Sequence, residues 1–273
     1  MAKEPLDTIF LDHLCRRGAG SIHALGRGGT EALLDVLSFT EGESVLELGC
    51  GTGETLVRMA AAGVRPLFGL DNSETMVDCA RRRCGFCRVQ DKVEIRQGVE
   101  GSPWPFESGA LDVVFAESVM AILDRGVRRS VVREVARVLK TGGRFLFSDS
   151  IWRQGVQRET IMKYNERCCA DFGIPQATVD WVGPGACERE LNEFGLDLVF
   201  DGVLAELPKR TEALPHPVEK ALLRSRLFTF QARVRAMLSP AFLVREFRFK
   251  TAALRLREVG RLIEPRLVVA RRN

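Results

Sequence analysis

Three glycines at alternate positions follow an apolar, strand-like run in the segment VLELGCGTGE, residues 45–54. A strand that ends in Gly-x-Gly-x-Gly and leads into a helix lets the backbone approach a ligand closely, and the first helical turn adds N–H donors. The dinucleotide-binding pattern Gly-x-Gly-x-x-Gly would place its third glycine one residue later than Gly53. The spacing therefore favours a nucleoside ligand other than a dinucleotide.

Two acidic residues narrow the choice of ligand. Asp71 closes the second predicted strand, where doubly wound sheets bind ribose hydroxyls. Glu47 lies inside the first predicted strand, where a charge is costly unless it receives hydrogen bonds or meets a cation. A ligand with a ribose and a cationic amino-acid moiety accounts for both acids, whereas a pyrophosphate leaves Glu47 unexplained.

Strand-like segments alternate with helical periodicity through the first two-thirds of the 273 residues. This alternation predicts an α/β fold, a doubly wound, mostly parallel seven-stranded sheet with helices on both faces. The predicted strands are 44–48, 66–70, 92–96, 111–116, 144–148, 196–204 and 265–270. The predicted helices within this core are 54–62, 73–83, 127–139 and 186–194.

The chain is expected to form a single domain, residues 1–273, with attachments to a core at 41–150. Residues 1–40 are predicted to be a helical cap, 151–185 a lid segment and 209–263 a basic helical insertion before the last strand. Residues 1–208 carry 24 Lys/Arg against 31 Asp/Glu, whereas residues 209–273 carry 16 against 5. The C-terminal quarter is therefore a separate compositional unit.

Four segments, in this order, resemble the class I S-adenosylmethionine-dependent methyltransferases: VLELGCGTGE, GLDNSETMVDCARR, SPWPFESGALDVVFAESVMAILD and REVARVLKTGGRFLFSD. The resemblance points to the small-molecule branch typified by quinone-biosynthesis enzymes. It covers about residues 28–149 and the helix and strand at 186–204. It implies a Rossmann-like methyltransferase fold, the cofactor S-adenosyl-L-methionine, and in-line displacement of a methyl group from its sulfonium.

The resemblance also implies which residues hold the cofactor. The acid and glycines of the first turn would line the methionine portion, Asp71 would bind the ribose diol, and Glu117 would contact the amino-acid end or the substrate. Asn72 and Met76 would lie beside the adenine. Many relatives have an acid directly after the glycine of the third-strand turn, which holds the adenine amino group, but here Val99 and Glu100 follow Gly98. The implied set is Glu47, Gly49, Cys50, Gly51, Gly53, Asp71, Asn72, Met76, Val99, Glu100 and Glu117.

Three residues are candidates for a catalytic role: His23, Asp149 and Tyr164. His23 lies in a glycine-rich connection expected to fold over the cofactor, and it is a candidate base or an ordinary packing residue. Asp149 ends the fifth predicted strand at the edge where open sheets bind ligands. In the lid segment Tyr164, Trp152 and Trp181 would cage the sulfonium, stack on an aromatic acceptor, or pack in the core.

The eight cysteines have several interpretations. Cys84 and Cys87 have the spacing of half a zinc site, but a second pair with that spacing is missing, and no metal is predicted. Cys168 and Cys169 would form a thiol cluster with Cys50 or Cys187, which raises arsenite methylation as a hypothesis. The alternative is that these are buried, incidental thiols.

The basic segment contains an amphipathic helix with Leu223, Leu227, Phe230, Val234 and Met237 on one face. Four alternatives stay open for the basic helices: their apolar faces cover the substrate pocket, they lie on an anionic membrane surface, they bind nucleic acid through phosphate contacts, or they mediate dimerisation. Interleaved phenylalanines favour burial or a lipophilic substrate over phosphate binding.

These features together predict methyl transfer to a small, hydrophobic or aromatic metabolite of secondary metabolism. Two alternatives stay open, an RNA methyltransferase that uses the basic helices and a non-catalytic cofactor-binding module at a lipid surface. The sequence lacks a bilayer-spanning apolar run and a signal-peptide pattern, so a cytoplasmic location is expected.

Overall fold

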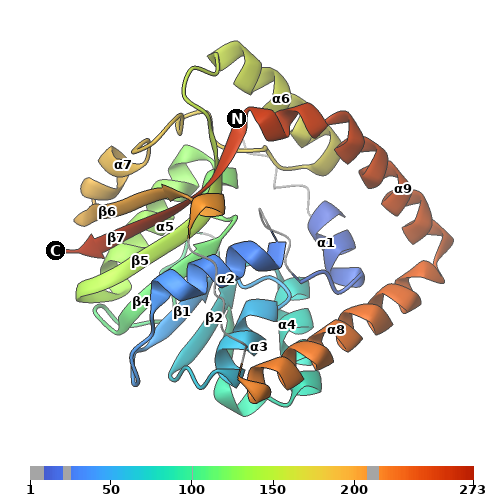
Figure 1. Ribbon diagram of the computed structural model, residues 1–273, viewed down its shortest axis with the longest axis horizontal. Coiled ribbons are helices and arrows are strands. Elements are labelled where there is room, and N and C mark those ends of the chain that lie inside the picture. Colours follow the sequence, from blue (N-terminus) through green and yellow to red (C-terminus); the bar gives the residue numbers. More distant parts are fainter. Residues whose placement is uncertain (1–8, 21–25, 100, 208–214) are drawn as a thin grey trace.

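A seven-stranded sheet forms the centre of the computed structural model, which describes residues 9–20, 26–99, 101–207 and 215–273 (Figure 1). The strand order is β3-β2-β1-β4-β5-β7-β6. The pairs from β3 to β5 are parallel, and β7 is antiparallel to both neighbours. The strands are β1 (Val45–Leu48), β2 (Leu67–Asp71), β3 (Glu94–Gln97), β4 (Leu111–Glu117), β5 (Leu139–Trp152), β6 (Leu196–Val203) and β7 (Ile263–Arg272). The predicted doubly wound fold is confirmed.

Helices cover both faces of the sheet and make two hydrophobic clusters. The cluster on one face joins α2, α3 and α4, and the cluster on the other joins α5, α6 and α7. Because both faces are covered, β1 is buried at all four positions and reads as a continuous apolar run broken only by its acid. The helices are α1 (Ile9–Arg16), α2 (Gly26–Leu37), α3 (Glu54–Ala61), α4 (Glu74–Cys87), α5 (Arg125–Val138), α6 (Arg158–Phe172), α7 (Glu188–Asn192), α8 (His216–Met237) and α9 (Pro240–Arg255).

The strand order reverses at β1, which lies between β2 and β4. The chain crosses over one face after β1 and over the other face after β4, so the first helical turns diverge at this edge. Open α/β sheets bind ligands at such a switch point, outside the carboxyl ends of the strands. The glycine turn after β1 lies at this place, as the resemblance implies.

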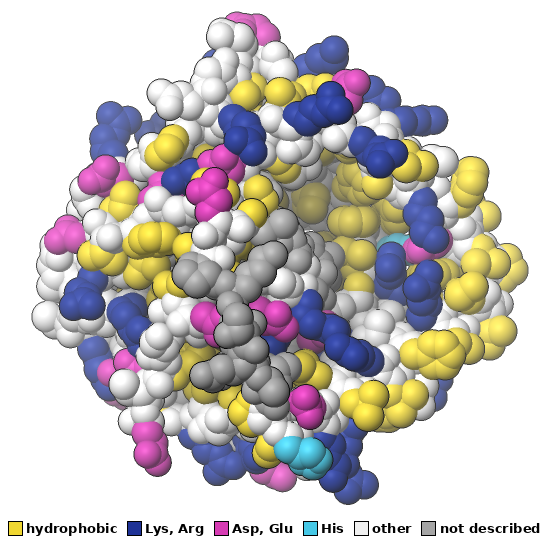
Figure 2. Space-filling view, viewed as in Figure 1, with side chains coloured by type: hydrophobic (Ala, Val, Ile, Leu, Met, Phe, Trp, Pro, Cys, Tyr) yellow, Lys and Arg dark blue, Asp and Glu magenta, His cyan; other side chains and the backbone are white. Residues whose placement is uncertain are grey.

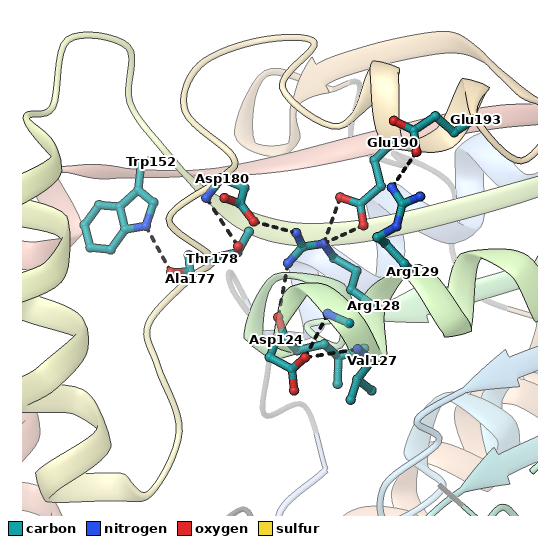
Figure 3. Close-up of polar contacts among 12 residues, drawn as sticks. Asp124, Val127, Arg128, Arg129, Trp152, Ala177, Thr178, Asp180, Glu190 and Glu193 are labelled. Carbon is teal, nitrogen blue, oxygen red and sulfur yellow. Dashed lines mark hydrogen bonds and ion pairs between the residues drawn. The ribbon is translucent and has the colours of Figure 1, made fainter. Parts of the chain in front are cut away.

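The segment predicted as a lid is anchored at its C-terminal half by a buried arginine of α5 (Figure 3). Arg128 is fully buried and donates to the Glu190 carboxylate at 3.0 and 3.1 Å and to Asp180 Oδ2 at 3.0 Å. Its guanidinium lies 4.8 Å from the Trp181 ring centroid. Trp152 and Trp181 are buried in the core, so for these two residues core packing replaces the predicted caging role.

Helices α8 and α9 form an arch along one edge of the molecule (Figure 1). The docked face of α8 carries Ala221, Leu222 and Ser225, and this helix packs on α3 and α4. The interpretation that its apolar stripe covers the substrate pocket is wrong, because the stripe from Leu223 to Met237 is exposed. The helix docks through the apolar Val218 and Leu222 together with the smaller Ala221 and Ser225.

Candidate active site

Three carboxylates converge at the carboxyl edge of the sheet, one from each of three adjacent strands. Glu47 is in β1, Asp71 ends β2 and Glu117 ends β4. Parallel pairing sets β1 between the other two strands, which brings the three acids to one edge. The sequence indicates each of these acids separately, and the strand order of the sheet brings them together.

Glu47 is the most constrained of these acids. It is 4% exposed, and its Oε2 has no hydrogen-bond partner among the described residues. Burial raises the pKa of its carboxyl well above the usual range, and Glu117 and Asp71 raise it further. A buried carboxyl in this state is stabilised by a cation, and an ammonium group of a ligand at this edge would supply one.

The glycine turn needs its glycines for two reasons. Gly49, Gly51 and Gly53 all have positive φ, between 50° and 77°, a region that L side chains rarely adopt. A Cβ on Gly49 would lie 2.5 Å from Val119, and one on Gly53 would lie 2.9 Å from Ala80 of α4. Close packing therefore requires the outer two glycines, while the space beside Gly51 is open. Cys50 between them is buried under β2.

Asp71 holds the turn as well as facing the edge. Its Oδ2 accepts from Gly51 N–H at 2.8 Å and its Oδ1 accepts from Ser73 N–H at 2.9 Å. Burial raises the pKa of this carboxyl, and those two hydrogen bonds lower it in part. The carboxylate thus ties the ends of β1 and β2 together and leaves its remaining lone pairs for a ribose diol.

The residues expected beside the adenine are dispersed. The Asn72 side chain lies over Gly98, where a Cβ would come within 2.3 Å of its Oδ1. Met76 is buried in α4 against Cys15 of α1, and Val99 is 66% exposed. Glu100 lies outside the described residues. The adenine contacts stay a prediction.

Glu117 links the edge to two helices. It accepts hydrogen bonds from Thr30 Oγ1 of α2 at 3.0 Å and from Thr55 Oγ1 of α3 at 2.9 Å. Its placement beside Glu47 agrees with a contact to the amino-acid end of the cofactor. The sequence suggested Glu117 from the resemblance, but neither threonine had a recognisable signal.

Arg83 supports the site from within α4, a role that was not predicted from the sequence. This buried side chain of α4 donates to Thr52 O and Gly18 O at 2.8 Å each, and to Ser225 Oγ at 2.6 Å. Burial lowers the pKa of its guanidinium. One side chain therefore joins the glycine turn, the segment after α1 and the basic helix α8. Arg83 is one of three consecutive arginines, so the sequence gives no signal that it alone has this role.

The predicted catalytic residues have different surroundings. Asp149 is 2% exposed, its Oδ2 accepts from Met120 N–H at 3.0 Å, and burial raises the pKa of its carboxyl to about 7. Tyr164 is half-buried in α6 against the core. His23 lies outside the described residues. All three stay predictions, and Asp149 has in addition a clear structural role in holding the turn after β4.

A hollow with hydrophobic walls opens in one face of the molecule, below α6 and beside α9 (Figure 2). The helices that border it meet in an aromatic cluster. Phe10 contacts Phe172 and Phe249 with ring centroids 4.9 and 5.0 Å apart, and His13 stacks on Phe242 at 4.3 Å. The buried His13 shares a hydrogen bond of 2.7 Å with Glu246. This His13–Glu246 pair was not anticipated from the sequence.

The cysteines do not gather into one site in the part of the chain that is described. Cys50, Cys84 and Cys87 belong to one hydrophobic cluster, while Cys168 and Cys187 belong to the other. Burial raises the pKa of the Cys84 and Cys87 thiols to about 12 and about 11. Residues 9–20, 26–99, 101–207 and 215–273 contain no group of three or more His, Cys, Asp or Glu that could hold a metal ion. The thiol cluster behind the arsenite hypothesis is therefore not formed there.

Glu47 Oε2 has no partner among the residues that the structure describes, the space beside Gly51 is open, and Asp71 supplies a second acid. These three features fit a ligand with an ammonium group and a ribose. Comparison with known proteins agrees, because residues 45–143 match the methyltransferase domain family. For this core the match confirms the resemblance to class I S-adenosylmethionine-dependent methyltransferases and the predicted cofactor, S-adenosyl-L-methionine.

The chain is also similar in sequence to individual methyltransferases. The chain is 35% identical over 121 residues to 27-O-demethylrifamycin SV methyltransferase of Amycolatopsis mediterranei. That match spans 44% of this chain and 43% of the relative, so it covers less than half of either protein. The whole protein's activity is therefore taken up below as a proposal.

Solved structures show the same fold. The [4+2]-cyclase SpnF has a TM-score of 0.65 at 17% identity, covering 96% of this chain and 93% of its own. Geranyl diphosphate C-methyltransferase of Streptomyces coelicolor A3(2), solved with S-adenosyl-L-homocysteine, has a TM-score of 0.57 at 18% identity, covering 89% and 78%. At these identities the likeness concerns the fold alone.

Proposed function

We propose that this protein transfers a methyl group from S-adenosyl-L-methionine to a small, hydrophobic or aromatic metabolite. The observation that carries the proposal is the orphaned Glu47 oxygen beside Asp71 and Glu117 at the switch point of the sheet. The hydrophobic hollow bordered by α6 and α9 supports the choice of acceptor, because an apolar pocket selects apolar ligands (Figure 2).

The reaction would consist of one displacement. The methyl carbon bonds to the acceptor atom as its bond to the sulfonium sulfur breaks, and the bonding pair stays on sulfur. Because the leaving group is already activated, this chain's residues mainly orient the reactants and exclude water. An acceptor that loses a proton needs a base, for which His23, Asp149 and Tyr164 remain the predicted candidates and His13 is a further one.

A labelled-methyl assay tests the proposal. The full chain is incubated with methyl-labelled cofactor and either a panel of phenols, quinols and hydrophobic alcohols or total RNA. We expect label in an organic-extractable product and none in RNA. Label in RNA alone would support the RNA methyltransferase alternative, and cofactor binding without transfer to any acceptor would support the non-catalytic module.

Two variants connect the assay to the site. Asp71→Ala removes the carboxylate expected to hold the ribose and should weaken cofactor binding by about tenfold to a hundredfold, as a charge-assisted hydrogen bond is lost. Asp78→Ala, an exposed acid on the neighbouring helix, is the matched control and should leave binding unchanged. A cytoplasmic location remains part of the proposal and is checked by cell fractionation.

A further inference from the structure

The outer faces of α8 and α9 expose many large hydrophobic side chains. Their exposed fractions run from 45% to 80%. We call this set the outer stripe; its members are Leu223, Leu227, Phe230, Val234, Met237, Leu238, Leu243, Val244, Phe247 and Leu254. Scattered apolar side chains are normal on a surface, but an apolar set that follows two consecutive helices indicates a binding surface.

The outer stripe is not needed to hold α8 on the core. At 3.6 residues per turn, Leu223, Phe230 and Val234 share one face, and Ala221 and Ser225 lie on the opposite face. That opposite face is the one that docks, through the contact of Ser225 with Arg83 and the burial of Val218, Ala221 and Leu222. The helix therefore has two separate contact surfaces, one used within the chain and one directed outward.

Positive charge accompanies the outer stripe. Residues 216–257 carry ten Lys/Arg against two Glu, Glu219 and Glu246. Glu246 is already bound to His13 at 2.7 Å and to Lys250 at 3.2 Å. On α8 the exposed Arg233 follows one border of the stripe and Arg235 the other. Figure 2 shows hydrophobic side chains along the outer edge that α8 and α9 form, with Lys and Arg side chains beside them.

We propose that the outer stripe docks this protein on an anionic lipid surface. The lipid interior accepts the apolar side chains, while long arginine side chains reach the phosphates beside them. A second copy of this chain would bring arginines against arginines, which opposes association. Nucleic acid would pair with the arginines but leave leucines and phenylalanines exposed to water.

Docking of this kind is peripheral. No helix in the described part of the chain is long and apolar enough to span a bilayer. In Figure 2 hydrophobic side chains lie along the outer edge where α8 and α9 run, and on α9 the aromatic cluster uses the buried Phe242 and Phe249 instead. A docked protein would keep its core and its cofactor edge outside the lipid.

Vesicle flotation of the full chain, without cofactor, tests the proposal independently of methyl transfer. Vesicles of phosphatidylcholine with phosphatidylglycerol are compared with phosphatidylcholine alone, each at low and high salt. We expect binding to the anionic vesicles and a clear loss of it at high salt, because salt screens the arginine–phosphate attraction. Absence of binding to anionic vesicles at low salt would overturn the proposal.

Paired variants identify the surface. Phe230→Ser/Phe247→Ser removes one aromatic side chain from each helix and should weaken anionic-vesicle binding by at least about tenfold. The matched control is Val199→Ser/Phe200→Ser, two exposed hydrophobic residues of the edge strand β6 on the opposite side of the molecule (Figure 1), which should bind as the wild type does. Equal binding by the first pair, or a concentration-dependent dimer that this pair abolishes, would contradict lipid docking.

Discussion

Arg83 Nη1 of α4 donates to Ser225 Oγ of α8 at 2.6 Å, and the same guanidinium donates to Thr52 O of the cofactor turn at 2.8 Å. One side chain thus connects the basic helix α8 to the glycine turn that is expected to hold the cofactor. Anything that shifts α8 acts directly on the backbone before Gly53. The segments that the sequence separates by more than 140 residues form one structural unit.

We expect Arg83→Met to destabilise the protein and to weaken its cofactor binding. The substitution leaves the Thr52 carbonyl without its donor and removes one of the two donors to Gly18 O, the other being Thr229 Oγ1, at a cost on the order of 3 kcal/mol. Urea unfolding measures the loss of stability, and calorimetry with S-adenosyl-L-homocysteine measures affinity. The control is Arg81→Met on the same helix, 55% exposed, which should change stability by less than about 0.5 kcal/mol. Equal effects of both variants would refute the special role of Arg83.

Glu47→Gln should raise the stability of the ligand-free protein and lower its affinity for the cofactor product. Because burial raises the pKa of Glu47 in the folded protein, ionisation of the unfolded chain opposes folding once the pH exceeds the ordinary carboxyl pKa. We therefore expect the ligand-free variant to be more stable than the wild type near pH 8, by on the order of 1 kcal/mol. Its affinity for S-adenosyl-L-homocysteine should fall by at least about tenfold, since the ammonium group loses its anionic partner.

The exposed Glu41, just before β1, provides the matched control for Glu47. Glu41→Gln should change neither stability nor affinity appreciably. If Glu47→Gln bound the cofactor product as tightly as the wild type, the assignment of Glu47 to the ammonium group would be wrong.

The raised pKa of Asp149 predicts that the stability of the folded protein depends on pH. Its pKa of about 7 in the folded protein lies above the usual carboxyl value, so the folded state binds the proton more tightly than the unfolded state. The stabilisation is complete below the unfolded pKa, near 4, and is lost as the pH rises to about 7. Asp149→Asn keeps an oxygen for Met120 N–H but does not titrate. Thermal unfolding between pH 4.5 and 8 should show the wild type losing stability relative to the variant, and parallel curves would contradict this.

Glu246→Leu should loosen the aromatic cluster. Removing the carboxylate leaves the buried His13 Nε2 without its partner and should cost about 1–3 kcal/mol. Glu258→Leu, an exposed acid beyond α9, is the control. Limited proteolysis reports whether α9 is released from α1, and unchanged cleavage of both variants would argue against the pair as an anchor.

Most of the fold, and the acids at the carboxyl edge of the sheet, could be predicted from the sequence. The seven strands, the acids Glu47, Asp71 and Glu117 and the glycine turn all follow from local pattern and resemblance, because cofactor recognition uses backbone geometry at fixed spacing. The strand predicted at 144–148 was too short. In the structure β5 runs from Leu139 to Trp152, and the added residues show no strand pattern in the sequence.

Other features depended on contacts between distant segments. The sequence by itself determined the periodicity of α8, and it thereby marked one apolar face and its flanking arginines. Only the tertiary structure decided which face docks, because the surface of α3 and α4 receives Val218, Ala221 and Leu222, and Arg83 binds Ser225. Periodicity states which residues share a face, whereas the complementary surface elsewhere in the chain decides which face is buried.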